Sequence, residues 1–94
     1  MQVKVALQRY ILEKSRKNEV IHLTKVKHQL GKVDFTIGRG EAPNTYSIWQ
    51  YSKECRCGDK VIESSTPFSL ANYLQDFCGN SHLKKNLPLH KYSY

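Results

Sequence analysis

Residues 33–52 of the chain, VDFTIGRGEAPNTYSIWQYS, decide which folds are open to it. Apolar and polar residues alternate over 33–37, which is the pattern of a strand with one buried face. Residues 38–44 contain two glycines and a proline, and we therefore predict a loop there. Residues 45–52 are dense in aromatic and β-branched side chains, which favour a second strand. The segment thus predicts two strands joined by a loop, with no helix between them.

One further strand is predicted before this pair in the sequence and one after it. Residues 20–26, VIHLTKV, are rich in β-branched residues, and residues 60–64 form another short run. The alternation in 20–26 is imperfect, which either a β-bulge or a short helix over 24–30 would explain. We expect turns at residues 30–32 and 58–59. Strands that follow one another in this way favour an antiparallel meander.

One helix is predicted before the strands in the sequence and one after them. Residues 3–14 fit a helix or a strand, and we prefer the helix because Leu, Gln, Glu, Lys and Arg dominate the second half. Its apolar face would consist of Val3, Ala6, Leu7, Tyr10 and Ile11. A second helix is expected over 67–78. Thr66 would cap it, Pro67 would occupy its first position and Gly79 would end it.

The predicted fold class is α+β: an antiparallel β-meander of three to four strands with an N-terminal helix and a C-terminal helix packed on one face. Residues 1–79 would form this single α+β domain, and residues 80–94 a basic flexible C-terminal tail. A winged helix is disfavoured because residues 33–52 leave no recognition helix. A double-stranded-RNA-binding domain shares the order helix, sheet, helix. The last helix here begins TPFSLANYL, however, without the lysines that start that family's last helix.

Size and charge exclude several classes of protein. The chain has 94 residues, with 15 Lys and Arg against 8 Asp and Glu, and a net charge of +7. This length allows one domain and excludes a multidomain enzyme. No apolar stretch is long enough to span a membrane, and we recognise no secretory leader. The odd count of three cysteines is typical of reduced thiols, so we expect a cytoplasmic protein.

Positive charge is concentrated at the two ends of the chain. Residues 1–32 carry eight basic residues against two acids, and residues 81–94 carry three basic residues and no acid. A cationic cluster binds the closely spaced phosphates of nucleic acid by releasing counterions, although it can also serve only to keep a small protein soluble. On a helix, Arg9 and Arg16 would lie about 20° apart on the outward side. The candidate phosphate contacts are Lys4, Arg9, Arg16, Lys17, Lys25 and Lys27.

Arg39 and two aromatic residues form a second candidate surface. Glycines on both sides of Arg39 would let its backbone approach a ligand closely. Trp49 and Tyr51 share one face of the strand predicted over 45–52. If the helices cover the other face, unpaired bases could stack on these two rings. The alternative places Trp49 in the hydrophobic core.

Metal binding and catalysis have little support in the sequence. Cys55, Cys57, Cys78 and His82 have the ligand types of a tetrahedral zinc site. The C-x-C spacing is tighter than in the usual zinc motifs, and Cys78 also completes the apolar stripe of the predicted helix. We therefore predict no metal and no other cofactor. No nucleophile with an adjacent base, carboxylate pair or phosphate-binding loop motif can be assigned, so we predict no enzyme activity.

The leading hypothesis is a small, non-catalytic nucleic-acid-binding protein that is weakly sequence-specific and salt-sensitive, with a regulatory role in gene expression. Its partner would be DNA or RNA, bound by the candidate phosphate contacts together with Arg39, Trp49 and Tyr51. The alternative is a protein-binding adaptor or inhibitor in which exposed aromatic residues of the sheet, namely Trp49, Tyr51 and Tyr46, anchor a partner. Neither hypothesis involves a membrane.

Overall fold

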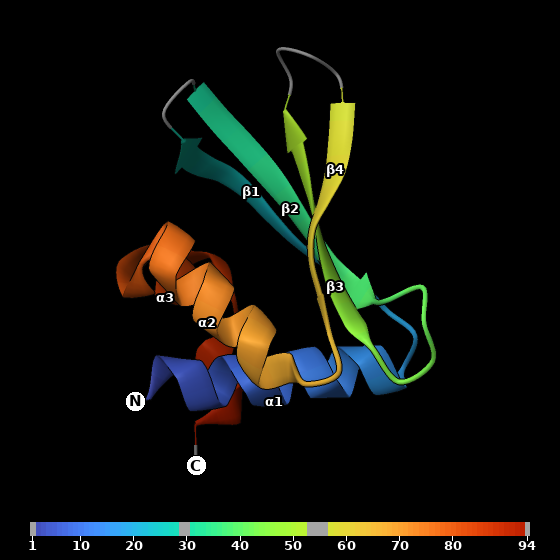
Figure 1. Cartoon of the computed structure of the whole chain (residues 1–94). Helices are drawn as coiled ribbons and strands as arrows, with labels where there is room; N and C mark the ends of the chain where they lie inside the picture. The colour runs from blue at the N-terminus through green and yellow to red at the C-terminus, as the bar shows by residue number, and fades with distance from the viewer. Residues whose placement is uncertain (1, 29–30, 53–56, 94) are drawn as a thin grey trace.

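Four strands, with helices before and after them, make up the fold (Figure 1). The structure is a computed structural model, and it describes residues 2–28, 31–52 and 57–93. In chain order the elements are α1 (Val3–Arg16), β1 (Ile21–His28), β2 (Gly31–Arg39), β3 (Tyr46–Ser52), β4 (Cys57–Ser64), α2 (Pro67–Cys78), α3 (Asn80–Asn86) and the 3-10 helix η1 (Leu89–Tyr92).

Helix α1 confirms the helix prediction for the N-terminal segment. Its buried apolar residues are those that helical spacing selected: Val3, Ala6, Leu7, Tyr10 and Ile11. A strand would have pointed successive residues to opposite faces, so Ala6 and Leu7 could not both be buried on one side of it. The chain leaves the helix at Asn18, whose φ of 57° lies in the left-handed region.

The strands form one antiparallel sheet in the order β1-β2-β3-β4, which confirms the predicted meander. Val33, Phe35 and Ile37 of β2 are buried, as the alternation predicted. Ile37 lies opposite Ile48 of β3, which is also buried. Because directly opposite residues of antiparallel strands share a face, these side chains identify the face that the helices cover.

One predicted turn is wrong, and the other lies partly outside the described residues. Gly58 and Asp59 lie within β4, because β3 and β4 stay paired as far as Cys57. Ladder hydrogen bonds along the whole hairpin outweigh the local turn preference of a Gly-Asp pair. β2 already begins at Gly31, while Leu30 lies outside the residues that the structure describes.

A β-bulge in β1 explains the imperfect alternation of that strand. The pairing register shifts between Leu23 and Val26, which are both buried. Lys25 has a φ of 58° there, and its backbone N–H donates to the Asp34 carboxylate at 3.0 Å. The extra residue reverses the parity, so that Val26 points into the core while Val20 stays 51% exposed. The bulge is therefore the right explanation, and the short helix is wrong.

Helix α2 begins and ends where the sequence predicted. Pro67 occupies the first position, and Gly79 ends the helix with a φ of 83°, which a glycine adopts without strain. Thr66 precedes the helix, but its side chain makes no capping hydrogen bond to the backbone. Instead, its hydroxyl lies 3.4 Å from that of Ser69. The buried residues of the helix are Leu70, Ala71 and Leu74.

Residues 80–93 correct the expectation of a flexible basic tail after residue 79. They form α3 and η1, and they contribute three leucines to the core: Leu83, Leu87 and Leu89. Arg9 Nη1 donates to the carbonyl oxygen of Tyr92 at 3.0 Å, and the rings of Tyr10 and Tyr92 lie 5.0 Å apart. The lysines of the segment stay exposed while its leucines turn inward. This short basic segment is therefore ordered because its leucines pack against the apolar face of α1 and the rest of the core.

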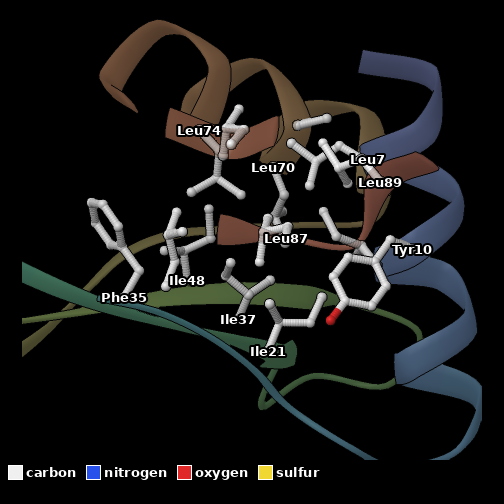
Figure 2. Packing of buried hydrophobic residues seen from close by; sticks show 14 of the residues in the cluster. Leu7, Tyr10, Ile21, Phe35, Ile37, Ile48, Leu70, Leu74, Leu87 and Leu89 are labelled. Atoms are coloured by element: carbon white, nitrogen blue, oxygen red, sulfur yellow. The ribbon is translucent and has the colours of Figure 1, made fainter. Parts of the chain in front are cut away.

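The core lies between the sheet and the helices (Figure 2). It combines residues from the first helix, the sheet and the C-terminal segment: Leu7, Tyr10, Ile37, Ile48 and Leu89. Phe35 extends it toward α2, with its ring 5.1 Å from that of Phe77 in an edge-to-face contact. The fold is therefore α+β, with an N-terminal helix, a four-stranded meander and C-terminal helices that pack on helix and sheet.

Leu89→Ala should lower the free energy of unfolding by about 2–5 kcal/mol, because it leaves a cavity in the core. Leu89 is 1% exposed, whereas Lys91 in the same short helix is exposed. Lys91→Ala is therefore the control and should change the free energy by less than about 0.5 kcal/mol. Urea denaturation measures both values. A Leu89→Ala variant as stable as the wild type would show that the C-terminal segment does not pack.

Candidate nucleic-acid interface

Trp49 and Tyr51 lie on the face of the sheet that points away from the helices. Ile48, which precedes Trp49 on β3, is buried under the helices. Alternation along the strand therefore points Trp49 and Tyr51 to the other side of the sheet. We call this side the open face. In register across the strands, it carries His22, Lys27, Lys32, Asp34, Thr36, Ser47, Trp49, Tyr51, Gly58, Lys60 and Glu63.

The two aromatic residues are accessible to different degrees. Trp49 is half-buried and does not belong to the core, so the alternative that placed it there is wrong. Tyr51 is 43% exposed. A Cβ atom on Gly58, directly across the ladder, would clash with the Tyr51 ring. The missing side chain at Gly58 therefore lets the ring lie close against the backbone of β4.

His22 and Thr36 continue the row that contains Trp49. His22 lies opposite Thr36, which in turn lies opposite Trp49. The His22 Nδ1 and Thr36 Oγ1 atoms are 3.4 Å apart. Neither residue was among the predicted site residues. The alternation of 33–37 already placed Thr36 on a polar face, but only the strand register puts His22 beside it.

Two lysines of the open face have no acidic partner in the part of the chain that the structure describes. Lys27 and Lys32 lie opposite one another on β1 and β2, and neither forms an ion pair there. Lys60, by contrast, is 3.1 Å from a Glu63 oxygen and 3.8 Å from a Glu41 oxygen. The hydrogen bond to Glu63 and the charge of Glu41 raise the pKa of Lys60. Among the described residues of this face, Lys27 and Lys32 are therefore the cations without an ion pair.

The cations of α1 lie in different surroundings from one another. Lys17 Nζ is 3.1 Å from Glu13 Oε1. Lys4 Nζ lies 5.3 Å from the centre of the Phe68 ring, at cation–π distance. Arg16 is exposed, and within the described ranges it has no hydrogen bond or ion pair. Arg16 is thus the α1 cation most available to a ligand.

Arg39 is placed beside α1 rather than beside the aromatic residues. Its Nε donates to the carbonyl oxygen of Ser15 at 3.2 Å, which ties the end of β2 to the end of α1. The Gly40 N–H donates to the Thr45 carbonyl oxygen at 2.9 Å and closes the β2–β3 loop. Arg39 and Arg16 line the same hollow between that loop and α1.

The six candidate phosphate contacts do not form one surface. α1 lies at one end of the sheet, and the paired ends of β1 and β2 point away from it (Figure 1). Lys27 is six strand residues beyond the start of β1 at Ile21, which corresponds to about 20 Å. The basic residues of 1–32 are therefore divided between the outer side of α1 and the far end of β1. Of the predicted site, the open face brings together Lys27, Trp49 and Tyr51.

A zinc site is not assembled by residues 2–28, 31–52 and 57–93, which hold no group of three or more suitable His, Cys, Asp or Glu side chains. Cys55 lies outside these ranges. Cys57 is disulfide-bonded, so the expectation of reduced thiols is wrong for this residue, and it has no thiolate to offer a metal. Cys78 is a free, half-buried thiol, and burial raises its pKa to about 11. The buried His82 Nε2 has no hydrogen-bond partner in the described structure. A thiol with such a raised pKa is a poor nucleophile and a poor metal ligand at neutral pH.

Comparison with protein-family models, with curated proteins and with solved structures finds no match to this chain. Within the described residues, no helix combines the length and the hydropathy needed to cross a membrane. The geometry of the open face is therefore the basis of the function proposed below.

The raised pKa predicts slow alkylation of Cys78. With a pKa of about 11 in place of 9.0, the thiolate fraction at pH 8 falls about 100-fold, and reaction with iodoacetamide slows with it. Mass spectrometry of the Cys78 peptide measures the rate, which should keep rising up to about pH 11. In urea the same peptide should react like an ordinary thiol. A plateau near pH 9 in the folded protein would contradict the prediction.

Proposed function

We propose that this protein binds single-stranded nucleic acid, without catalysis and with weak sequence preference, through the open face of its sheet. One observation carries the proposal. Trp49 and Tyr51 lie beside each other on the face opposite the helices, and Lys27 and Lys32 share that face.

Aromatic rings on an exposed sheet suit unpaired bases. Trp49 and Tyr51 are two residues apart on one strand, which corresponds to about 7 Å along β3. Every base has a flat face that can stack on such rings, so stacking tolerates many sequences. In a duplex the base faces are already stacked on one another, and the proposal therefore favours single strands. His22 and Thr36 add polar atoms next to Trp49 that can bond to the edge of a stacked base.

Lys27 and Lys32 would hold the phosphates of a strand whose bases stack on the two rings. The two lysines lie opposite one another near the end of β1. Lys32 is two residues before Asp34 on the same face of β2, and Asp34 lies opposite Tyr51. Asp34 accepts a hydrogen bond from the backbone N–H of Lys25, which holds its carboxylate at the bulge of β1. Phosphate contacts from these two lysines would give a modest and salt-dependent affinity.

The alternative hypothesis, a protein-binding adaptor or inhibitor, would use Trp49 and Tyr51. Tyr46, its third expected anchor, packs against the core instead. A protein contact anchored by Trp49 and Tyr51 owes its affinity to desolvated apolar area, and salt weakens it far less than it weakens phosphate binding. The salt dependence described below separates the two hypotheses.

Replacing Tyr51 or Trp49 with alanine should weaken binding to a twelve-nucleotide oligothymidine. Each stacked base contributes about 1–3 kcal/mol, which corresponds to a loss of roughly 5- to 150-fold in affinity. Fluorescence anisotropy of a dye-labelled oligothymidine measures the affinity of every variant. Trp49 is the single tryptophan of the chain, so quenching of its own fluorescence also reports stacking in the variants that keep it.

Two variants control this experiment. Phe68→Ala removes an aromatic residue that is 47% exposed on α2, outside the open face, and should leave the affinity unchanged. Tyr51→Phe keeps the ring and should bind like the wild type. If the folded Tyr51→Ala and Trp49→Ala variants bind as well as Phe68→Ala, the open face is not the binding surface.

Replacing Lys27 and Lys32 together with glutamine should flatten the salt dependence of oligothymidine binding. Each phosphate contact to a single strand contributes about −0.7 to the slope of log affinity against log salt, so the double variant should lose about 1.4 from the slope. Titrations between about 50 and 200 mM NaCl measure it.

The matched control is the double replacement of Lys84 and Lys85 by glutamine on α3, which changes the net charge by the same amount. It should keep the wild-type slope. An equal loss in both double variants would show that net charge alone attracts the oligonucleotide. Ligand binding that is insensitive to salt would favour the adaptor hypothesis.

A further inference from the structure

Three hollows meet on the outward side of α1. The largest, of about 550 Å³, lies between the second half of α1 and residues 39–46. A second hollow of about 500 Å³ lies between α1 and η1, and a third of about 280 Å³ reaches Pro67. Leu12 lines all three of them. They therefore form one connected surface, which we call the α1 groove.

The α1 groove follows a stripe of the helix that the core does not use. Val5, Arg9, Leu12 and Arg16 are spaced by four, three and four residues, which places them on one side of a helix. The buried residues of α1 occupy the opposite side. The stripe runs over residues 5–16, and the eleven rises between its ends correspond to about 17 Å along the helix axis. Val5 and Leu12 are half-buried apolar residues that no other element fully covers.

The charges around the groove are predominantly positive. Arg9 and Arg16 flank Leu12, while Arg39 and Lys91 come from the two opposite walls. Arg16 is exposed, and in the described part of the chain it has no hydrogen bond or ion pair.

The two acids of the groove are already engaged. A hydrogen bond from Tyr92, and then one from Lys17, lower the pKa of Glu13. Glu41 is 3.8 Å from Lys60 Nζ. Each carboxylate therefore has a lysine beside it, Lys17 for Glu13 and Lys60 for Glu41, whose charge offsets part of its own. An incoming acidic group would meet the exposed Arg16 with little competition from these two carboxylates.

We propose that the α1 groove binds an acidic segment of a partner protein that carries apolar anchor residues. Val5, Leu12 and Pro67 would receive the anchors, and the arginines beside them would pair with Asp or Glu of the segment. The length of the stripe fits about three turns of a partner helix or about five residues of an extended strand.

A peptide fits this groove better than a nucleic acid does. The hollow that reaches Pro67 is lined mainly by apolar surface, which suits an aliphatic side chain better than the charged and hydroxylated groups of a sugar–phosphate backbone. Bases favour flat aromatic rings, whereas the middle of this groove is a leucine. The inference does not rest on the proposed nucleic-acid site, because the groove lies on α1 and the open face on β1 to β4.

Selection from a phage-displayed library of random twelve-residue peptides tests this proposal. The full chain is immobilised, and the Leu12→Ser/Arg16→Glu variant serves for counter-selection. Enriched peptides should combine Asp or Glu with Leu, Phe or Trp. A synthetic copy of the most enriched peptide should lose about tenfold or more in affinity for Leu12→Ser, as expected for a buried anchor. Arg16→Gln should lose several-fold, because one charge-assisted contact disappears.

Lys84→Gln is the matched control, since it removes an exposed cation of α3 that does not line the groove, and it should bind the peptide like the wild type. Arg16 is exposed, so Arg16→Gln keeps the test valid even if Leu12→Ser unfolds, which circular dichroism reveals. Enrichment of peptides without acids, or no enrichment over the double variant, would overturn the proposal. Oligothymidine binding by Arg16→Gln, measured in parallel, should stay at the wild-type level and reports on the open face separately.

Discussion

The burial of one face of a four-stranded sheet is the constraint on which the rest of this structure depends. Side chains alternate between the two faces of a strand, so each residue that packs under the helices points its neighbours to the other side. Burial of Ile48 places Trp49 on the open face, and burial of Phe35 and Ile37 places Thr36 there. The surface proposed to bind nucleic acid is thus a geometric consequence of the core.

Connectivity then determines where the positive charge lies. α1 ends beside the first residues of β1, and β1 leads away from it toward the far end of the sheet (Figure 1). The lysines and arginines of residues 1–32 therefore lie on two separate surfaces. Arg16 and Arg39 lie at the α1 groove, whereas Lys27 and Lys32 lie on the open face. The proposed nucleic-acid site and the proposed peptide site can for this reason be tested independently.

Elements with strong local patterns were predictable, and those that depend on distant contacts were not. Helix α2 has its proline, glycine and apolar stripe within one segment, and β2 shows clean alternation. The C-terminal segment lacks such a pattern, since Leu83, Leu87 and Leu89 become a core contribution only against α1 and the sheet. The bulge at Lys25 was one of two open explanations, because the Asp34 carboxylate that accepts its N–H lies on the next strand.

By itself, the sequence determined the α+β class, the meander, both long helices and the shared face of Trp49 and Tyr51, because periods of two and of 3.6 residues are local properties of a chain. Tertiary structure alone decided which face stays open, which lysines lie beside the aromatic rings, and that the last residues complete the core and form one wall of the α1 groove. Those outcomes depend on contacts between residues far apart in the sequence, such as the bond from Arg9 to the carbonyl oxygen of Tyr92, and no local pattern encodes them.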